Sequence, residues 1–204
     1  MSIGFRPIAD NARYAGSTAV AKLYEESSCH YVLHVNRIEF EIRHLFISAG
    51  HNFFGHHGRA PDENPMTETG EVRCVAGKGI VGDRFFCYRN GRKGNITFFE
   101  EETYQALCLE LGVWDRGPDV FRRNVITRGV KLNALIGVEF EIQSVRFFGD
   151  EESRPCYWMD YAFAPGAENA LKGRGGLRAT ILSDGVLRQT QRASIILQSI
   201  GITC

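Results

Sequence analysis

The sequence has no excess of charge of one sign and no long apolar run. Lys and Arg together number 24 among the 204 residues, and so do Asp and Glu, so no overall field attracts nucleic acid or an anionic membrane. No stretch reaches the roughly 18 apolar residues that a membrane span needs, and no apolar segment near the start has the form of a secretory signal. We therefore expect a cytoplasmic protein that binds neither nucleic acid nor membrane.

Paired cysteines are also lacking. The six cysteines, at positions 29, 74, 87, 108, 156 and 204, include no CxxC pair and no regular spacing. This pattern argues against a disulfide framework and against a structural zinc site. The chain also lacks a four-cysteine iron–sulfur pattern and a dinucleotide-binding GxGxxG. Any redox chemistry would therefore draw its electrons from a separate partner.

Short stretches that alternate apolar and polar residues are the main structural signal. Such alternation is typical of strands with one face in a core. It predicts strands over residues 37–47, 71–75 and 138–142, with a short buried strand or helical turn at 194–197. Turn signals predict two hairpins, one joining residues 85–89 to 95–99 through Asn90-Gly91 and one joining 179–182 to 186–188 through Asp184-Gly185.

Helical signals are fewer. Residues 97–112 predict a helix, because glutamates 100–102 suit its positive end and Gly112 suits its last turn. Residues 164–171 predict a second, short one. The fold class is therefore mainly β (α+β), a β-barrel with peripheral helices. We expect one domain over residues 35–204, after an N-terminal extension of residues 1–34 that is mobile or, alternatively, a docking tail.

Cys156 is the first candidate for a functional residue. It follows Pro155 and lies two positions after Arg154. A neighbouring guanidinium favours the thiolate, which attacks electrophiles and binds soft metals. The alternative is that Cys156 is a small buried hydrophobic residue, as most free cysteines are.

Three loops carry further polar candidates. Residues 77–84 contain three glycines followed by Asp83 and Arg84 but lack the GK[ST] ending of a phosphate-binding Walker loop. The glycine-arginine stretch at 173–178 either cradles an anion or forms a flexible turn. The histidines at 51, 56 and 57 have three possible roles: they bind a metal, they contact a ligand, or they pack within their loop. Clustered arginines suit a small anionic ligand.

Five segments in order resemble a known family. They read ISAGHNFFGHHG (47–58), GKGIVGDRFF (77–86), FRRNVITRGVKLNALIG (121–137), ESRPCYWMD (152–160) and GRGGLRA (173–179). Together they resemble a MOSC domain, the module named for the C-terminus of molybdenum-cofactor sulfurases, which also occurs as short stand-alone proteins. The resemblance covers residues 36–192 and implies a MOSC-type β-barrel.

The resemblance also implies a ligand and its contacts. The ligand is the molybdenum cofactor (molybdopterin), a pterin with a dithiolene and a phosphate, and Cys156 matches the cysteine that binds the metal or carries sulfur. Arg122 and Asn124 match an Arg-x-Asn motif and are expected to contact cofactor or substrate. Further expected contacts to the pterin and the phosphate are Asp83, Arg84, Arg174 and Arg178.

The resemblance leads to one preferred function and one alternative. The first is reduction of an N-hydroxylated base or amidoxime, a small-molecule substrate, with electrons from a separate redox partner. The alternative is a sulfur-carrier or cofactor-delivery module with a persulfide on Cys156, supplied by a separate cysteine desulfurase. A third hypothesis, from the residues alone, is a metallohydrolase that uses His51, His56 and His57. Ala49, Ser153 and the long histidine loop depart from the family pattern and leave the substrate open, and the sequence leaves both monomer and oligomer open.

Overall fold

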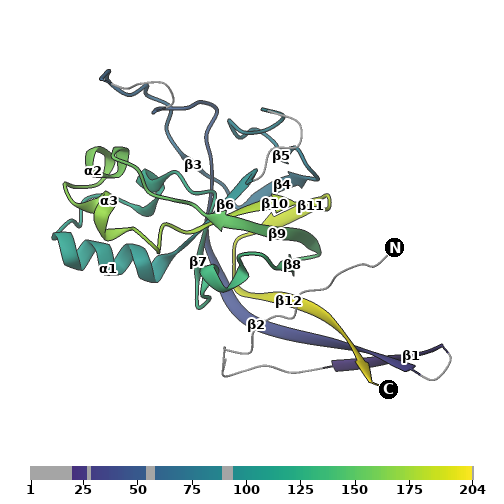
Figure 1. The fold of residues 1–204 in the computed structure, drawn as a ribbon. Helices are drawn as coiled ribbons and strands as arrows, with labels where there is room; N and C mark the ends of the chain where they lie inside the picture. The colour runs from purple at the N-terminus through teal and green to yellow at the C-terminus, as the bar shows by residue number, and fades with distance from the viewer. Residues whose placement is uncertain (1–19, 27–28, 54–57, 89–93, 204) are drawn as a thin grey trace.

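The computed structural model describes residues 20–26, 29–53, 58–88 and 94–203, and a closed β-barrel lies at its centre (Figure 1). Within this part of the chain seven strands form the ring, and pairing of the last with the first closes it. In ring order they are β2 (Cys29–Ile47), β12 (Thr190–Thr203), β8 (Glu139–Ile142), β9 (Val145–Glu152), β10 (Leu177–Ile181), β6 (Ile96–Glu100) and β7 (Val125–Arg128). Only β6 and β7 run parallel among these pairs. The mainly β fold predicted from the sequence is confirmed.

Smaller elements surround the barrel. Strand β1 (Val20–Glu26) pairs with the N-terminal part of β2, and β3 (Thr67–Glu68) pairs with the C-terminal end of β2. A second sheet consists of β11 (Gly185–Arg188), β4 (Glu71–Val75) and β5 (Gly79–Ile80). The helices α1 (Glu101–Leu111), α2 (Trp158–Ala162) and α3 (Ala167–Ala170) cover one side of the barrel (Figure 1), and η1 (Pro118–Phe121) and η2 (Leu132–Leu135) are single 3₁₀ turns. No helix among the described residues is long and apolar enough to cross a membrane.

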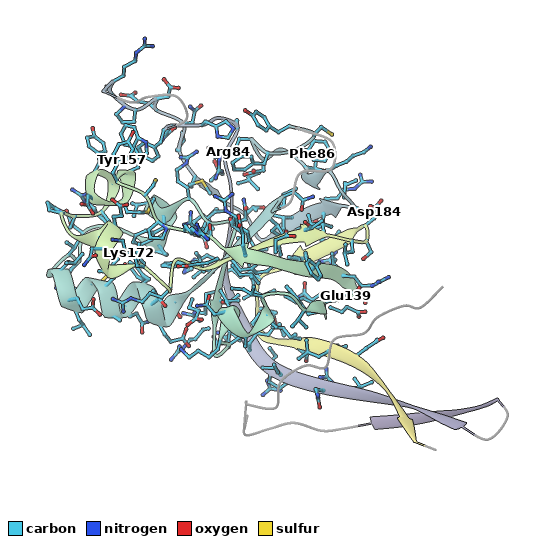
Figure 2. All side chains as sticks on the ribbon, viewed as in Figure 1. Arg84, Phe86, Glu139, Tyr157, Lys172 and Asp184 are labelled. Atoms are coloured by element: carbon cyan, nitrogen blue, oxygen red, sulfur yellow. The ribbon has the colours of Figure 1, made fainter. Side chains whose placement is uncertain are left out.

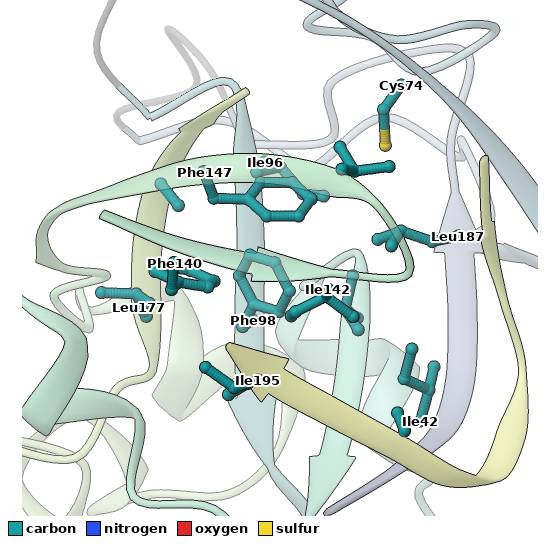
Figure 3. Packing of buried hydrophobic residues seen from close by; sticks show 14 of the residues in the cluster. Ile42, Cys74, Ile96, Phe98, Phe140, Ile142, Phe147, Leu177, Leu187 and Ile195 are labelled. Atoms are coloured by element: carbon teal, nitrogen blue, oxygen red, sulfur yellow. The ribbon is translucent and has the colours of Figure 1, made fainter. Parts of the chain in front are cut away.

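Aromatic rings fill the barrel interior (Figure 3). Phe98, Phe140 and Phe147 come from three strands, and their ring centroids lie 5.5–6.1 Å apart. Phe140 and Ile142 alternate with carboxylates along β8, as the sequence predicted, so that strand turns one apolar face inward. Burial of these large side chains provides much of the free energy that closes the barrel.

A second apolar layer lies between the barrel wall and the helices. Adjacent residues divide between the two layers: Leu45 faces the interior core and Phe46 the outer one, and Phe98 and Phe99 divide in the same way. Strands buried on both faces show no alternation in sequence. The outer layer includes Leu107 and Cys108 of α1, and both side chains are buried.

The predicted helix at residues 97–112 was wrong at its start and right at its end. Helix α1 begins at Glu101, because residues 97–100 belong to β6 and pair with β7 and β10 on either side. Gly112 takes the left-handed conformation (φ 66°) expected of a C-terminal glycine, and its N–H donates to the carbonyl of Cys108. Backbone pairing on both edges of β6 outweighs the local helical signal.

Both predicted hairpins were wrong. Residues 85–88 form turns, because Asp83 accepts from the Phe85 N–H (3.1 Å) and the Phe86 N–H donates to the Asp83 carbonyl (2.9 Å). Residues 90–93 lie outside the described part. Strand β11 pairs with β4 and not with β10, and the carboxylate of Asp184 accepts from the Ala76 N–H (2.8 Å). Contacts between segments distant in sequence therefore replace the two local pairings.

Three further predictions differ from the structure in extent. The boundary expected at residue 34 falls within β2, which runs without interruption from Cys29 to Ile47, so strand structure crosses it. Residues 1–19 of the predicted extension lie outside the described residues. The strand expected at 194–197 is part of the longer β12. The short helix expected at 164–171 is α3, and α2 before it was not predicted.

The buried thiol of Cys74 should make the free energy of unfolding fall as pH rises through the alkaline range. Its side chain is fully buried, and burial raises the pKa of the thiol from 9.0 to about 12. Because the unfolded chain loses this proton first, the stabilisation is complete below about pH 9 and is lost as pH rises toward 12. Between about pH 8 and pH 10.5, we expect the free energy of unfolding to fall by about 1–2 kcal/mol more in the wild type than in Cys74→Ala. Urea unfolding at the two pH values measures the difference.

The exposed thiol of Cys87 provides the control. Cys87→Ala should follow the wild type at both pH values. An equal fall in wild type and Cys74→Ala would show that burial of the Cys74 thiol contributes nothing.

Candidate functional site

Asp83 is the centre of a buried polar cluster at one end of the barrel. Its Oδ2 accepts from the N–H of Ser48, the Nη1 of Arg84 and the Nδ2 of Asn124, each at 3.2 Å. The Asp83 and Arg84 side chains are almost completely buried. Burial lowers the pKa of Arg84, while the Asp83 carboxylate acts in the opposite direction. The loop at residues 77–84 is thereby joined to the ends of β2 and β7.

Arg122 ties the loop after β2 to the same cluster. Its Nη1 donates to the carbonyl of Asn64 (2.7 Å), and its Nη2 donates to Ser48 Oγ (2.9 Å) and to the carbonyl of Gly50 (2.7 Å). Burial and the nearby Arg84 guanidinium lower the pKa of Arg122 to about 10, with Asp83 opposing them. A planar guanidinium presents its N–H donors in a fixed fork, which suits these three acceptors.

Asn124 joins three segments. Its Oδ1 accepts from the backbone N–H and the hydroxyl of Thr97, at 3.1 and 2.9 Å, and its Nδ2 also donates to the carbonyl of Phe46 (3.2 Å). The structure thus brings together four predicted site residues, which with Ser48 we call the Asp83 cluster: Ser48, Asp83, Arg84, Arg122 and Asn124. Their side chains bond one another and backbone groups of the surrounding loops, and these bonds hold the loops in place. Direct contact with a ligand stays a prediction for them.

Cys156 lies exposed just before α2, and its carbonyl accepts from the N–H of Met159 (2.8 Å). Arg123 and Arg178 lie nearby: burial and the Arg178 guanidinium lower the pKa of Arg123 to about 10, whereas Cys156 acts to raise it. Arg178 is half-buried on β10, and its guanidinium has no hydrogen bond or ion pair with any residue that the structure describes. The Arg123 guanidinium is therefore within electrostatic range of the Cys156 thiol and of the Arg178 guanidinium.

Arg174, the other predicted arginine of this loop, is held elsewhere. Its Nη1 and Nη2 pair with the carboxylate of Glu110 on α1 at 3.0 and 2.6 Å, and its Nε donates to the carbonyl of Ala170 (2.6 Å). The bond from Arg174 lowers the pKa of Glu110. The structure directs Arg174 toward α1, and its contact with a ligand stays a prediction.

The glycines beside Arg174 hold the segment that carries Cys156. The N–H of Ser153 donates to the carbonyl of Gly176 (2.7 Å), and the N–H of Gly175 donates to the Glu152 carboxylate (3.0 Å). A Cβ at Gly175 would lie 2.5 Å from the carbonyl oxygen of Ser153, so the two segments approach more closely than a side chain allows. The observed hydrogen bonds show a turn that packs on the Cys156 segment, and an anion cradle in this stretch stays a prediction.

The histidine loop reaches the same end of the molecule. His51 is half-buried, and its ring meets Phe85 and Tyr88 edge-on, at centroid distances of 4.7 and 5.5 Å. His56 and His57 lie outside the described residues. Among the residues that the structure does describe, no three or more His, Cys, Asp or Glu side chains gather as metal ligands would.

An aromatic stack links the histidine loop to α2. Phe53 stacks on Trp158 at a centroid distance of 4.5 Å, and Trp158 meets Tyr157 at 4.8 Å. Figure 2 shows Tyr157, Arg84 and Phe86 along one end of the barrel.

Sequence analysis did not select Phe53 and Trp158, and it noted Arg123 only within an arginine cluster. The doubled arginine in FRRN is the signal that could have identified Arg123.

Comparison with known proteins identifies the fold. No family model and no curated protein matches the chain. The YuaD protein from Bacillus subtilis is 17% identical, with a TM-score of 0.62 over 80% of this chain and 98% of that chain. YiiM from Escherichia coli is 15% identical, with a TM-score of 0.51 over 80% of this chain and 69% of that one. YuaD and YiiM are MOSC-fold proteins.

The fold is MOSC-like. YiiM from Geobacillus stearothermophilus agrees, at 12% identity and a TM-score of 0.54 over 78% of this chain and 75% of that one. The MOSC-like fold accounts for the seven-stranded ring and for the few helices outside it. At these identities the likeness covers the fold and extends to no ligand or reaction.

Proposed function

We propose that this protein binds the molybdenum cofactor at Cys156 and reduces N-hydroxylated compounds, with electrons from a separate redox partner. The observation that supports it most is the exposed thiol of Cys156 within electrostatic range of Arg123. Arg178 also acts on Arg123, and its guanidinium makes no hydrogen bond or ion pair with a described residue. A thiolate is a soft metal ligand, and a guanidinium binds phosphate through two parallel hydrogen bonds. This donor set suits a ligand with a soft metal and an anionic group.

An unpartnered polar atom near Cys156 fits the same proposal. Ser153 is fully buried three positions before Cys156, and its Oγ has no hydrogen-bond partner in the described part of the protein. Buried hydroxyls are almost always satisfied, so an orphaned one points to a group that completes it. When bound, the cofactor would supply the two-electron oxygen removal at its metal.

The residues of this chain would bind and position the cofactor. Cys156 would provide the metal ligand, and Arg178 would bind the anionic group. The Asp83 cluster would keep the loops at that end of the barrel in one arrangement, because its hydrogen bonds join β2, β6 and β7 with the loop at residues 77–84. We propose that Asp83, Arg84, Arg122 and Asn124 act mainly through this support. Support of this kind pre-organises a site before the ligand arrives.

Molybdenum content tests the proposal. The protein would be purified from a host that makes the cofactor, as wild type, Cys156→Ala and Cys87→Ser. We expect near-stoichiometric molybdenum in the wild type and in Cys87→Ser, whose replaced thiol is also exposed but lies in another loop. Cys156→Ala should retain at least about tenfold less, because even residues behind metal ligands change affinity by that amount. A wild type without molybdenum would contradict the proposal.

The exposure of Cys156 also supports the alternative, a sulfur carrier. A separate cysteine desulfurase would transfer a sulfane sulfur to the Cys156 thiol, and the persulfide would pass it to an acceptor. On this hypothesis the purified protein contains no molybdenum, and cyanide releases thiocyanate from the wild type but not from Cys156→Ala. The same preparations therefore separate the two functions.

A further inference from the structure

We propose that Arg123 is the residue that positions Cys156, by tying its segment to the glycine-arginine loop and by holding a positive charge beside the thiol. The inference concerns the Cys156 site of the proposed function, but it is tested on protein without metal. The sequence predicted a ligand contact for Arg122 and none for Arg123. In the structure Arg122 bonds within the Asp83 cluster.

Arg123 bonds its own segment and two segments that are distant in sequence. Its Nη1 donates to the carbonyl of Phe121 in η1 (3.0 Å). Its Nη2 donates to the carbonyl of Ser153 (2.8 Å), and its Nε donates to the carbonyl of Gly175 (3.2 Å). Ser153 and Gly175 flank the close approach described above, so one guanidinium spans the contact between the two segments.

The two segments also bond each other directly. The Ser153 N–H donates to Gly176, and Glu152 accepts from the Gly175 N–H. Cys156 follows three residues after Ser153, and Pro155 between them restricts the backbone. Loss of Arg123 would therefore remove two of the bonds that fix where the Cys156 segment leaves β9.

The charge of Arg123 is not balanced by an ion pair. All three of its hydrogen bonds go to carbonyl oxygens, and no carboxylate of the described residues lies within ion-pair distance. Removing water from an unpaired cation costs free energy. Burial and the Arg178 and Arg84 guanidinium groups lower the pKa of Arg123, and the Cys156 and Glu152 side chains act in the opposite direction. An unpaired cation in this place suggests a role toward an anionic thiolate or ligand.

Two alkylating reagents that differ in charge can separate these effects. Iodoacetate is an anion and iodoacetamide is neutral, and the same thiolate attacks the CH2 carbon of each and displaces iodide. The ratio of their rate constants at Cys156 therefore reports the local charge, because thiol ionisation and access largely cancel. Mass spectrometry of the Cys156 peptide gives each rate on the metal-free full chain. Hydrogen exchange at residues 152–157 reports how firmly the segment is held.

Three variants test the two parts of the proposal. Arg123→Met should lower the iodoacetate to iodoacetamide ratio by about threefold to tenfold, as expected for one nearby charge, and should speed exchange at residues 152–157. Arg123→Lys keeps the charge but cannot bond all three carbonyls, so its ratio should stay within about twofold of wild type while exchange rises. Arg174→Met is the matched control, since Arg174 lies in the same loop but pairs with Glu110, and it should change neither quantity.

Two results would overturn the proposal. In the first, Arg123→Met has the same alkylation ratio and the same hydrogen exchange as the wild type. In the second, Arg174→Met changes both quantities as much as Arg123→Met does. If Arg123→Met does not fold, Arg123→Lys decides, because wild-type exchange at residues 152–157 in that variant rules out positioning. Molybdenum content is not measured here. Failure of this inference therefore leaves the proposed function standing, and failure to bind molybdenum leaves this inference standing.

Discussion

Replacing Asp83 by alanine is expected to lower the free energy of unfolding by about 3–5 kcal/mol. Asp83 is 6% exposed, and its carboxylate accepts from Arg84, Asn124 and the backbone around it. Without it the buried Arg84 guanidinium has no ion-pair partner among the residues that the structure describes, and the amide of Asn124 loses an acceptor. A buried cation left without its partner is far more costly than the loss of an exposed pair.

Thermal and urea unfolding measure this effect. In a protein of this length the expected loss corresponds to a melting temperature roughly 6–20 °C lower. The matched control is Glu139→Ala, which removes the partner of Arg146 from an exposed pair on the barrel surface (Figure 2) and should cost less than about 1 kcal/mol. Equal losses in both variants would show that the Asp83 cluster does not hold the loops.

Replacing Gly176 by alanine is expected to cost about 3–5 kcal/mol of stability through two effects. Gly176 has φ +95°, a backbone conformation that alanine adopts only with strain. Its added Cβ would also lie 2.2 Å from the carbonyl oxygen of Phe98, at the centre of the barrel wall. Relief of that contact requires β6 or the glycine-arginine loop to move, which disturbs packing on both faces of β6.

Gly173 in the same loop separates the two effects. It also has a positive φ (+77°), but a Cβ there would meet nothing within 4 Å. Gly173→Ala should therefore cost only the backbone strain, about 1–2 kcal/mol. Urea unfolding of both variants and wild type gives the comparison. If Gly176→Ala is no less stable than Gly173→Ala, close approach to Phe98 does not matter for the fold.

The strands of the barrel were predictable where one face of the strand is exposed and the other is buried. The alternation in residues 38–42, 71–75 and 139–142 reports the pleat of a half-buried strand, and all three segments are strands. The helix start was not predictable, because residues 97–100 are apolar on both faces and acidic at their end. Such a run suits a buried strand and the first turn of a helix equally well.

Strand partners were less predictable than the strands. Asn90-Gly91 and Asp184-Gly185 are strong hairpin signals in a chain considered locally. In the folded protein β6 pairs with β7 and β10, and β11 pairs with β4. Each of these pairings buries apolar side chains from distant segments. The free energy gained by that burial is several times larger than the local preference of a turn dipeptide, so the distant pairings form.

The sequence by itself determined the fold class, the β-strands with one buried face, and Cys156 as the candidate thiol. Only the tertiary structure decided which arginine lies beside it. Arg122 and Arg123 are adjacent, yet Arg122 bonds Ser48 and Arg123 bonds Ser153 and Gly175, which are 30 and 52 residues away from it in sequence. A local pattern cannot encode such partners, because a guanidinium takes whichever carbonyl oxygens the packed strands and loops bring within its reach.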